Sequence, residues 1–462
     1  MPEKMSKFLL GCTVLLLVHV ACASKKLPGH LKHLGAHQTG KGITMIGKFS
    51  RAPVFYGHFI KHNKPLWMRS ALEYVKHPGL DWTDQFLRKK YGDLNVKVEV
   101  GKKEDRTKRP TSMTLSQFLN SYKTNDLYLV QTLNDKMEEL VYVPECLHCG
   151  GLQKVIQEAV IWLGSGKAKS VLHYDDLDNI LCLLDGKKNF FLVDKAFKSD
   201  VEADGFVQSE GYSLVDVDKV DFEKFPRLAN IEWYQANLSK GDCLYVPKGW
   251  YHQVTSSGVR HLAINLWFAH VYWFDPSNCS IDQDYYKLIE PITKFGFASP
   301  NESYRSKLLE HLVDKELLFK DVVISSLGTS TEERRGQFFD AIDKYKDNVL
   351  SWGELYGFDI DKAISKFPDI FGLPGSWDYK SDDVLYDPIV EQPFEEPLAS
   401  EESTMSASSQ PLPDDTLLEN NQPNIDESPL EVTTHPDVVD VLEAESQDSQ
   451  KPQKVSSKKE EL

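Results

Sequence analysis

The stretch "SVLHYDDLDNILCLLDGKKNFFLV" (Ser170–Val193) decides the fold and raises a question about one lysine. The Asp185-Gly186 pair near its middle is typical of a two-residue β-hairpin turn, because both residues tolerate a positive φ. Two strands that pair across this turn share one face, made of Asn179, Leu181, Leu183, Lys188, Phe190 and Leu192. An ammonium among apolar side chains is costly unless a negative group meets it. The sequence therefore predicts an acidic partner for Lys188.

The surrounding sequence indicates a mainly β fold followed by helices. Short apolar segments separated by turn signals recur over residues 168–269, as in a β-sandwich or barrel. Residues 93–101 and 126–133 have the alternation of strands, and residues 113–122 have the spacing of a helix. From residue 285 to residue 374 the apolar spacing becomes helical.

Both ends of the chain carry targeting features. Lys4 and Lys7 precede the apolar run Phe8–Ala21, which predicts a secretory signal peptide over residues 1–23. This run is shorter than the roughly 18 to 20 residues that a membrane helix needs, so no membrane association is expected. Lys459–Leu462 (KEEL) is similar to the KDEL retrieval signal. We therefore expect a protein of the endoplasmic reticulum lumen that binds a retrieval receptor, with secretion as the alternative.

The net charge of −16 is concentrated in the tail, residues 376–462. This acidic, Pro- and Ser-rich segment predicts disorder, because it holds too few apolar residues to form a core. The rest of the chain is nearly neutral and has no basic run, which argues against nucleic acid as a partner.

The cysteines and glycosylation sequons also bear on the compartment. Cys146 and Cys149 form a single CxxC, which could serve zinc, redox chemistry or a local disulfide. One CxxC cannot supply four zinc ligands, so a local structural disulfide is the prediction. Cys182 and Cys243 lie in apolar strands and are predicted to be buried thiols. Three N-glycosylation sequons fit a luminal protein: Asn237, Asn278 and Asn301.

A possible metal site answers the question about Lys188. His173 and Asp175 occupy alternate positions of one extended segment, so their side chains point to the same face. His252 follows a turn further along the chain. Two imidazoles and one carboxylate form the facial triad of non-haem Fe(II) oxygenases. A dicarboxylate co-substrate that chelates the iron would send its far carboxylate to Lys188; the alternative is a buried Asp or Glu of the protein.

The pattern of these residues, with "HLAINLWF" (His261–Phe268), resembles the JmjC family of 2-oxoglutarate oxygenases and especially its protein hydroxylase branch. The resemblance implies a double-stranded β-helix of the cupin type with flanking helices over residues 24–282. A helical segment over residues 283–375 would follow, and related hydroxylases dimerise through such helices, so a homodimer is possible. Val130 departs from the branch, because its asparaginyl hydroxylase has a substrate-contacting glutamine there.

The resemblance also implies the role of each site residue. The iron ligands would be His173, Asp175 and His252. The distal carboxylate of 2-oxoglutarate would be bound by Lys188, Tyr128 and Ser170. Two further polar residues would line the co-substrate pocket, Asn179 and Asn265.

A second metal site is suggested in the helical segment. Its spacing matches an EF-hand loop with ligands at positions 1, 5, 9 and 12, which are Asp343, Asp347, Ser351 and Glu354. Tyr345 and Asn348 depart from the pattern at positions 3 and 6. We expect either a weak Ca²⁺ site or a helical hairpin without calcium.

Taken together, these features predict an Fe(II)- and 2-oxoglutarate-dependent oxygenase that hydroxylates a protein or peptide in the secretory pathway. One alternative is a lysine demethylase of the same family. The other is a non-catalytic, calcium-binding or chaperone-like luminal protein.

Overall fold

The computed structural model describes residues 29–100, 110–166, 168–209, 211–279 and 290–374. The predicted signal peptide, the acidic tail and the KEEL sequence lie outside these residues. No helix in the described ranges is both long and apolar enough to cross a bilayer.

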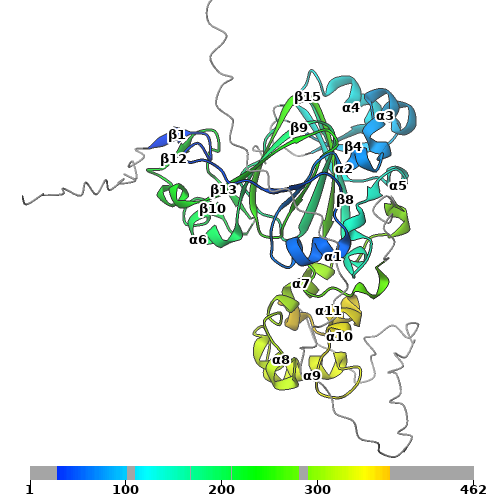
Figure 1. Cartoon of the computed structure of the whole chain (residues 1–462), viewed down its shortest axis with the longest axis vertical. Coiled ribbons are helices and arrows are strands. Elements are labelled where there is room, and N and C mark those ends of the chain that lie inside the picture. The colour runs from blue at the N-terminus through cyan, green and yellow to red at the C-terminus, as the bar shows by residue number, and fades with distance from the viewer. Residues whose placement is uncertain (1–28, 101–109, 167, 210, 280–289, 375–462) are drawn as a thin grey trace, which may run out of the picture.

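Two sets of elements make up the fold (Figure 1). The strands are β1 (His30–Lys32), β2 (Thr44–Ile46), β3 (Leu66–Met68), β4 (Asn95–Val100), β5 (Thr111–Thr114), β6 (Leu127–Thr132), β7 (Tyr142–Val143), β8 (Ile156–Gly164), β9 (Asp178–Val193), β10 (Phe206–Val207), β11 (Tyr212–Ser213), β12 (Val220–Asp221), β13 (Trp233–Ser239), β14 (Cys243–Val246), β15 (Tyr251–Phe268) and β16 (Glu290–Pro291). The α-helices are α1 (Ala52–Phe55), α2 (Ala71–Tyr74), α3 (Asp84–Tyr91), α4 (Leu115–Ser121), α5 (Asp135–Glu138), α6 (Lys198–Val201), α7 (Glu302–Glu310), α8 (Lys320–Ser326), α9 (Glu332–Ile342), α10 (Trp352–Gly357) and α11 (Ile360–Lys366).

A ten-stranded sheet in the order β2-β3-β14-β9-β15-β8-β6-β4-β5, with β13 on β9, forms the body of the protein. Its two longest strands, β9 and β15, run antiparallel along their whole length, from the pair Tyr251 with Val193 to the pair Phe268 with Asp178. The predicted mainly β, cupin-type fold with flanking helices is confirmed. The strands predicted around residues 93–101 and 126–133 are β4 and β6, and the predicted helix is α4.

The predicted hairpin at Asp185-Gly186 is wrong, because β9 is one continuous strand. Its register with β15 shifts at this point, so the pair forms a bulge. Gly186 has a φ of 83°, and a Cβ there would lie 2.2 Å from the carbonyl oxygen of Arg260. Only glycine fits this close approach of two backbones. The bulge also changes the alternation, so that the face predicted from a hairpin is nevertheless correct: one buried cluster contains Leu181, Leu183, Phe190 and Leu192.

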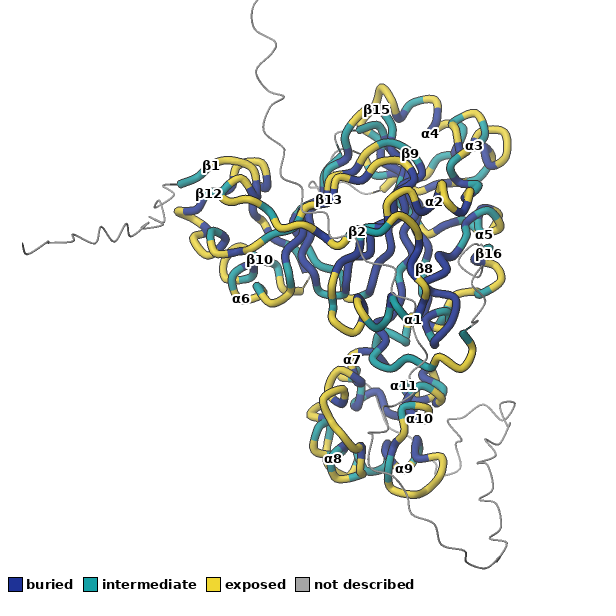
Figure 2. The backbone as a smooth tube through the Cα atoms, in the orientation of Figure 1, coloured by how far each residue is buried: buried dark blue, intermediate teal, exposed yellow. Residues whose placement is uncertain are grey.

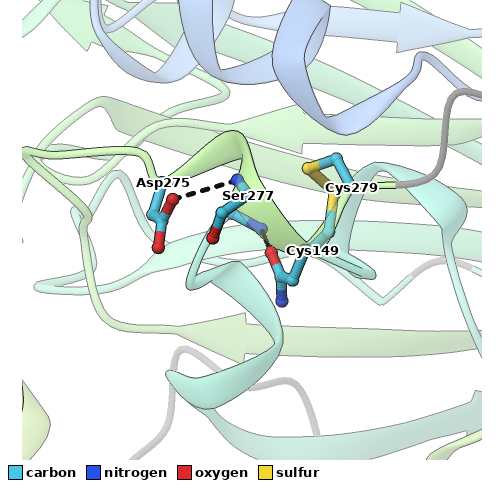
Figure 3. The surroundings of a disulfide bond; sticks show 6 residues. Cys149, Asp275, Ser277 and Cys279 are labelled. Carbon is cyan, nitrogen blue, oxygen red and sulfur yellow. Dashed lines mark hydrogen bonds between the residues drawn. A yellow bond between two sulfur atoms is a disulfide. The ribbon is translucent and has the colours of Figure 1, made fainter. Parts of the chain in front are cut away.

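The cysteine pairing also differs from the prediction. Cys182 and Cys243 are a disulfide and not two thiols, because they face each other as partners in the β9–β14 register. Cys149 bonds Cys279, 130 residues further along the chain, and not its neighbour Cys146 (Figure 3). Cys146 is a buried free cysteine, and burial raises the pKa of its thiol.

Helices α7 to α11 form the predicted helical segment, with a separate apolar core. Figure 1 shows α7 as the helix nearest the barrel, and Figure 2 shows exposed residues along the outer side of α8 and α9. Polar contacts that join the segment to the barrel include two ion pairs and a hydrogen bond. Lys307 pairs with Asp176 at 3.1 Å, Glu310 pairs with Lys248 at 3.1 Å, and the hydroxyl of Tyr356 accepts from the backbone N–H of Tyr272 at 2.9 Å.

Candidate metal and co-substrate site

The three predicted iron ligands come together at the mouth of the barrel. The ligand atoms of His173, Asp175 and His252 all lie within 4.8 Å of one another. Reciprocal backbone hydrogen bonds of 3.1 and 2.7 Å hold His173 against His252, and their ring centroids are 4.2 Å apart. His252 Nε2 lies 3.6 Å from Asp175 Oδ2.

Both imidazoles are oriented by the backbone. His173 Nδ1 lies 2.9 Å from the carbonyl oxygen of Val171, and His252 Nδ1 lies 3.0 Å from that of Trp250. A carbonyl can only accept, so each Nδ1 carries a proton, and Nε2 is the nitrogen whose lone pair a metal would use. Two neutral imidazoles and one carboxylate with open positions are the donor set of a non-haem Fe(II) site.

A cavity of about 250 Å³ extends from these ligands into the barrel. Lys188 lies on its wall and is only 3% exposed. The ammonium donates to Ser256 Oγ at 3.1 Å and to the hydroxyl of Tyr128 at 3.4 Å. Burial raises the pKa of the Tyr128 phenol, which therefore keeps its proton and can donate to an anion. Lys188 and Tyr128 therefore lie side by side on the cavity wall, where both could bind the same carboxylate.

Other polar atoms around the cavity are ready for a ligand. Ser170 Oγ accepts from the backbone N–H of Val254 at 2.9 Å, which leaves its own proton to donate. Some buried polar atoms of cavity-lining residues have no hydrogen-bond partner among the described residues, among them Asn179 Oδ1, Asn265 Oδ1 and Trp267 Nε1. Such atoms are rare unless a ligand or water meets them. The donors and acceptors present fit an Fe(II) ion and a dicarboxylate.

Sequence reasoning missed several residues of this cavity. Ser256 lies four residues after His252 on β15, and strand alternation from His252 through Val254 could have identified it. Trp162, Trp267 and Tyr174 add aromatic walls.

His261 also escaped the prediction. It is fully buried, and its ring centroid lies 5.3 Å from that of Tyr128. Burial, together with the charges of Lys188 and Arg260, lowers the pKa of His261 to about 2. A neutral imidazole therefore adds no positive charge beside Lys188.

The predicted calcium ligands, unlike the iron ligands, do not come together around one point. The helix–loop–helix shape is present as α9 and α10, and Asn348 adopts a φ of 63° where the EF-hand pattern has glycine. Asp343 accepts from the backbone N–H groups of Lys346 and Asn348, at 2.7 and 3.1 Å. Among the described residues, His173, Asp175 and His252 form a cluster of three metal-binding groups, and Asp343, Asp347 and Glu354 do not. Calcium binding remains a prediction. The carboxylates of Asp343 and Glu354 already accept hydrogen bonds from backbone N–H groups of the loop.

Glu354→Gln should lower the stability of the helical segment with or without calcium. Glu354 is 3% exposed, and its oxygens accept from the backbone N–H groups of Lys344 and Ser351, both at 2.8 Å. A glutamine amide group would point an N–H donor at one of these backbone donors. This should lower the free energy of unfolding by about 1 to 3 kcal/mol. Scanning calorimetry in calcium and in chelator measures this, with the exposed Asp347→Asn as control. If calcium raises the melting temperature of the wild type but not of Glu354→Gln, the loop is a calcium site.

Comparisons with known proteins agree with this geometry. A family model described as a cupin-like domain matches residues 52–274. Lysine-specific demethylase JMJ30 of Arabidopsis thaliana is 29% identical over 196 residues, which cover 40% of this chain and 45% of the relative. Lysine-specific demethylase 8 of Xenopus tropicalis is 26% identical over 232 residues, covering 48% and 50%. tRNA wybutosine-synthesizing protein 5 of Gallus gallus is 34% identical over 119 residues, covering 26% and 35%.

The chain spans half or less of the length of these three relatives, and their names point to different substrates. The cupin-like domain of this chain, residues 52–274, therefore belongs to the JmjC family of Fe(II)- and 2-oxoglutarate-dependent oxygenases.

Proposed function

We propose that the chain hydroxylates a protein or peptide substrate in the secretory pathway, with Fe(II) and 2-oxoglutarate as cofactor and co-substrate. The observation that carries this proposal is a single cavity with a facial triad at its mouth and the Lys188–Tyr128–Ser256 group on its wall. A cation with two hydroxyl neighbours suits the distal carboxylate of a dicarboxylate.

Each residue has a distinct task in this proposal. Bound iron would supply O2 activation coupled to oxidation of the co-substrate. Lys188 and Tyr128 hold the distal carboxylate, and Asn179 and Asn265 offer amide groups to the rest of the molecule. The aromatic walls limit the water that reaches the reacting centre.

Hydroxylation and demethylation are the two candidate reactions, because both begin at a substrate C–H bond. The names of the plant and frog relatives favour lysine demethylation. The predicted signal peptide and the KEEL sequence, with its retrieval receptor as a partner, favour a luminal protein without access to chromatin. The two disulfides agree with an oxidising compartment, where such bonds persist.

The test incubates the full chain with Fe(II), 2-oxoglutarate and a luminal protein extract. The proposal expects peptides with an added oxygen, detected by mass spectrometry as a 16 Da increase, and no formaldehyde. Release of formaldehyde with loss of methyl groups would establish the demethylase instead. Absence of any 2-oxoglutarate turnover under these conditions would favour the non-catalytic alternative.

In a secretory compartment we expect a glycan on Asn237 and none on Asn301. Asn237 is exposed on β13, where its partner in the sheet is Asn189 of β9. The Nδ2 of Asn301, to which a glycan attaches, instead donates to Asp361 at 2.7 Å. Glycosidase treatment and gel mobility check this, since Asn237→Gln should remove a glycan and Asn301→Gln should not.

Ser239→Ala is the matched control, because it destroys the same sequon and keeps Asn237. An unchanged mobility for both Asn237→Gln and Ser239→Ala would contradict the assignment of this site. Absence of a glycan from all three sequons would count against the compartment itself.

A further inference from the structure

Asp178, the first residue of β9, holds a carboxylate that solvent does not reach. Its side chain is 0% exposed. Oδ1 accepts from the hydroxyl of Tyr245 at 2.9 Å and from the backbone N–H of Lys248 at 2.8 Å. Oδ2 accepts from Nδ1 of His270 at 2.7 Å. A carboxylate is an acceptor with several lone pairs, so three converging donors match its ionised form.

The three donors come from elements that meet behind the iron ligands. Tyr245 lies on β14, His270 follows β15, and Lys248 lies in the turn that leads into His252. A buried carboxylate is tolerated only when its hydrogen bonds are made, so this group of residues fixes the three elements relative to one another.

The turn before His252 is attached to both sides of the triad. The backbone N–H of Lys248 donates to Asp178, and the next N–H, that of Gly249, donates to the carbonyl oxygen of Asp175 at 3.0 Å. Asp178 lies three residues after Asp175, and His252 lies three residues after Gly249. The segment with Asp175 and the turn before His252 are therefore joined by two consecutive backbone donors.

We propose that Asp178 is a positioning residue that sets the distance between the ligands Asp175 and His252 before metal binds. The inference rests on the proposed iron site. Without the Asp178 carboxylate, the backbone N–H of Lys248 loses its acceptor, and the turn that leads into His252 loses the anchor that holds it against the start of β9.

The helical segment is attached to this same group of residues. Lys248 Nζ pairs with Glu310 of α7 at 3.1 Å. The rings of His270 and Tyr272 are 4.7 Å apart, and the backbone of Tyr272 donates to the hydroxyl of Tyr356 on α10. The segment after the barrel thus supports the same turn from outside.

The test measures the affinity of the full chain for Mn(II), a stable substitute for Fe(II), by calorimetry without co-substrate. Asp178→Asn keeps the size of the side chain but points an amide donor at one of the three donors. Mn(II) affinity should fall about 10- to 100-fold, as for other groups that orient metal ligands. The matched control is Tyr245→Phe, which removes the donor from β14 and leaves the turn anchored. It should lower the melting temperature and leave Mn(II) affinity unchanged.

Two further variants apply if Asp178→Asn does not fold. His270→Phe removes the donor to Oδ2, so the carboxylate can turn away from Lys248 and Mn(II) affinity should fall several-fold. Tyr245→Phe, in contrast, leaves a donor on each oxygen. His270→Gln, which keeps a donor, should restore part of the affinity. Wild-type Mn(II) affinity in Asp178→Asn, or in both His270 variants, would overturn the positioning role alone. Failure of the wild type to bind Mn(II) would instead contradict the iron site.

Discussion

Replacing Asp175 by alanine should abolish metal-dependent turnover of 2-oxoglutarate and leave the barrel folded. Asp175 supplies the negative charge of the triad, and its Oδ2 lies 3.6 Å from His252 Nε2. Even groups that only orient metal ligands cost about 10- to 100-fold in metal affinity, so loss of a ligand should exceed about 100-fold. The Asp175 side chain is 29% exposed, so its removal should cost the fold little. Metal affinity by calorimetry and the melting temperature of the apoprotein measure the two effects separately.

Asp176→Ala is the matched control for this experiment. Its carboxylate is 56% exposed and pairs with Lys307 of α7, so it is an acidic neighbour that is not a ligand. This variant should bind metal as the wild type does. Equal metal affinities for Asp175→Ala and the wild type would remove the iron assignment.

The inner face of β9 shows how a correct prediction can follow from a wrong topology. Asp185-Gly186 has the composition of a hairpin turn, but Gly186 is needed for the close approach of the Arg260 carbonyl from β15. A hairpin and a bulge both reverse the strand alternation at this point, so both place Lys188 on the face of Leu181. The local sequence was enough to predict which side chains share a face. Whether the strand turns back or continues through a bulge depends on its partner β15, more than sixty residues away.

The disulfide pairing, in contrast, could not be predicted from the local sequence. The pairing of Cys182 with Cys243 follows from the register of β14 on β9, and that of Cys149 with Cys279 follows from how the chain returns after β15. Neither arrangement is visible in the spacing of cysteines along the sequence. The triad was predictable because two of its members alternate on one segment, and the same alternation from His252 leads to Ser256, whereas the contact of His261 with Tyr128 required the pairing of β15 with β8 and of β8 with β6.

Lys188→Met should keep the barrel folded and the metal bound, but weaken 2-oxoglutarate binding strongly. The ammonium lies at the cavity wall, 3% exposed, beside the hydroxyls of Ser256 and Tyr128. A charge-assisted contact at such a desolvated site is worth roughly 2 to 5 kcal/mol, which is about 30- to several-thousand-fold in affinity. Methionine has a similar length, and hydroxyl groups can turn to other partners. The measurements are 2-oxoglutarate affinity with Mn(II) bound and the melting temperature of the same variant.

Lys187→Met provides the matched control, because Lys187 is the preceding residue of β9 and is exposed on the other face. It should bind 2-oxoglutarate normally. The structural alternative assigns Lys188 to the fold, and it predicts the reverse order of effects, since loss of a lysine that holds protein groups in place lowers stability first. A Lys188→Met protein with a much lower melting temperature and normal 2-oxoglutarate affinity would therefore establish that alternative. A stable protein with selectively weakened co-substrate binding would show that the acidic partner of this lysine is the far carboxylate of 2-oxoglutarate.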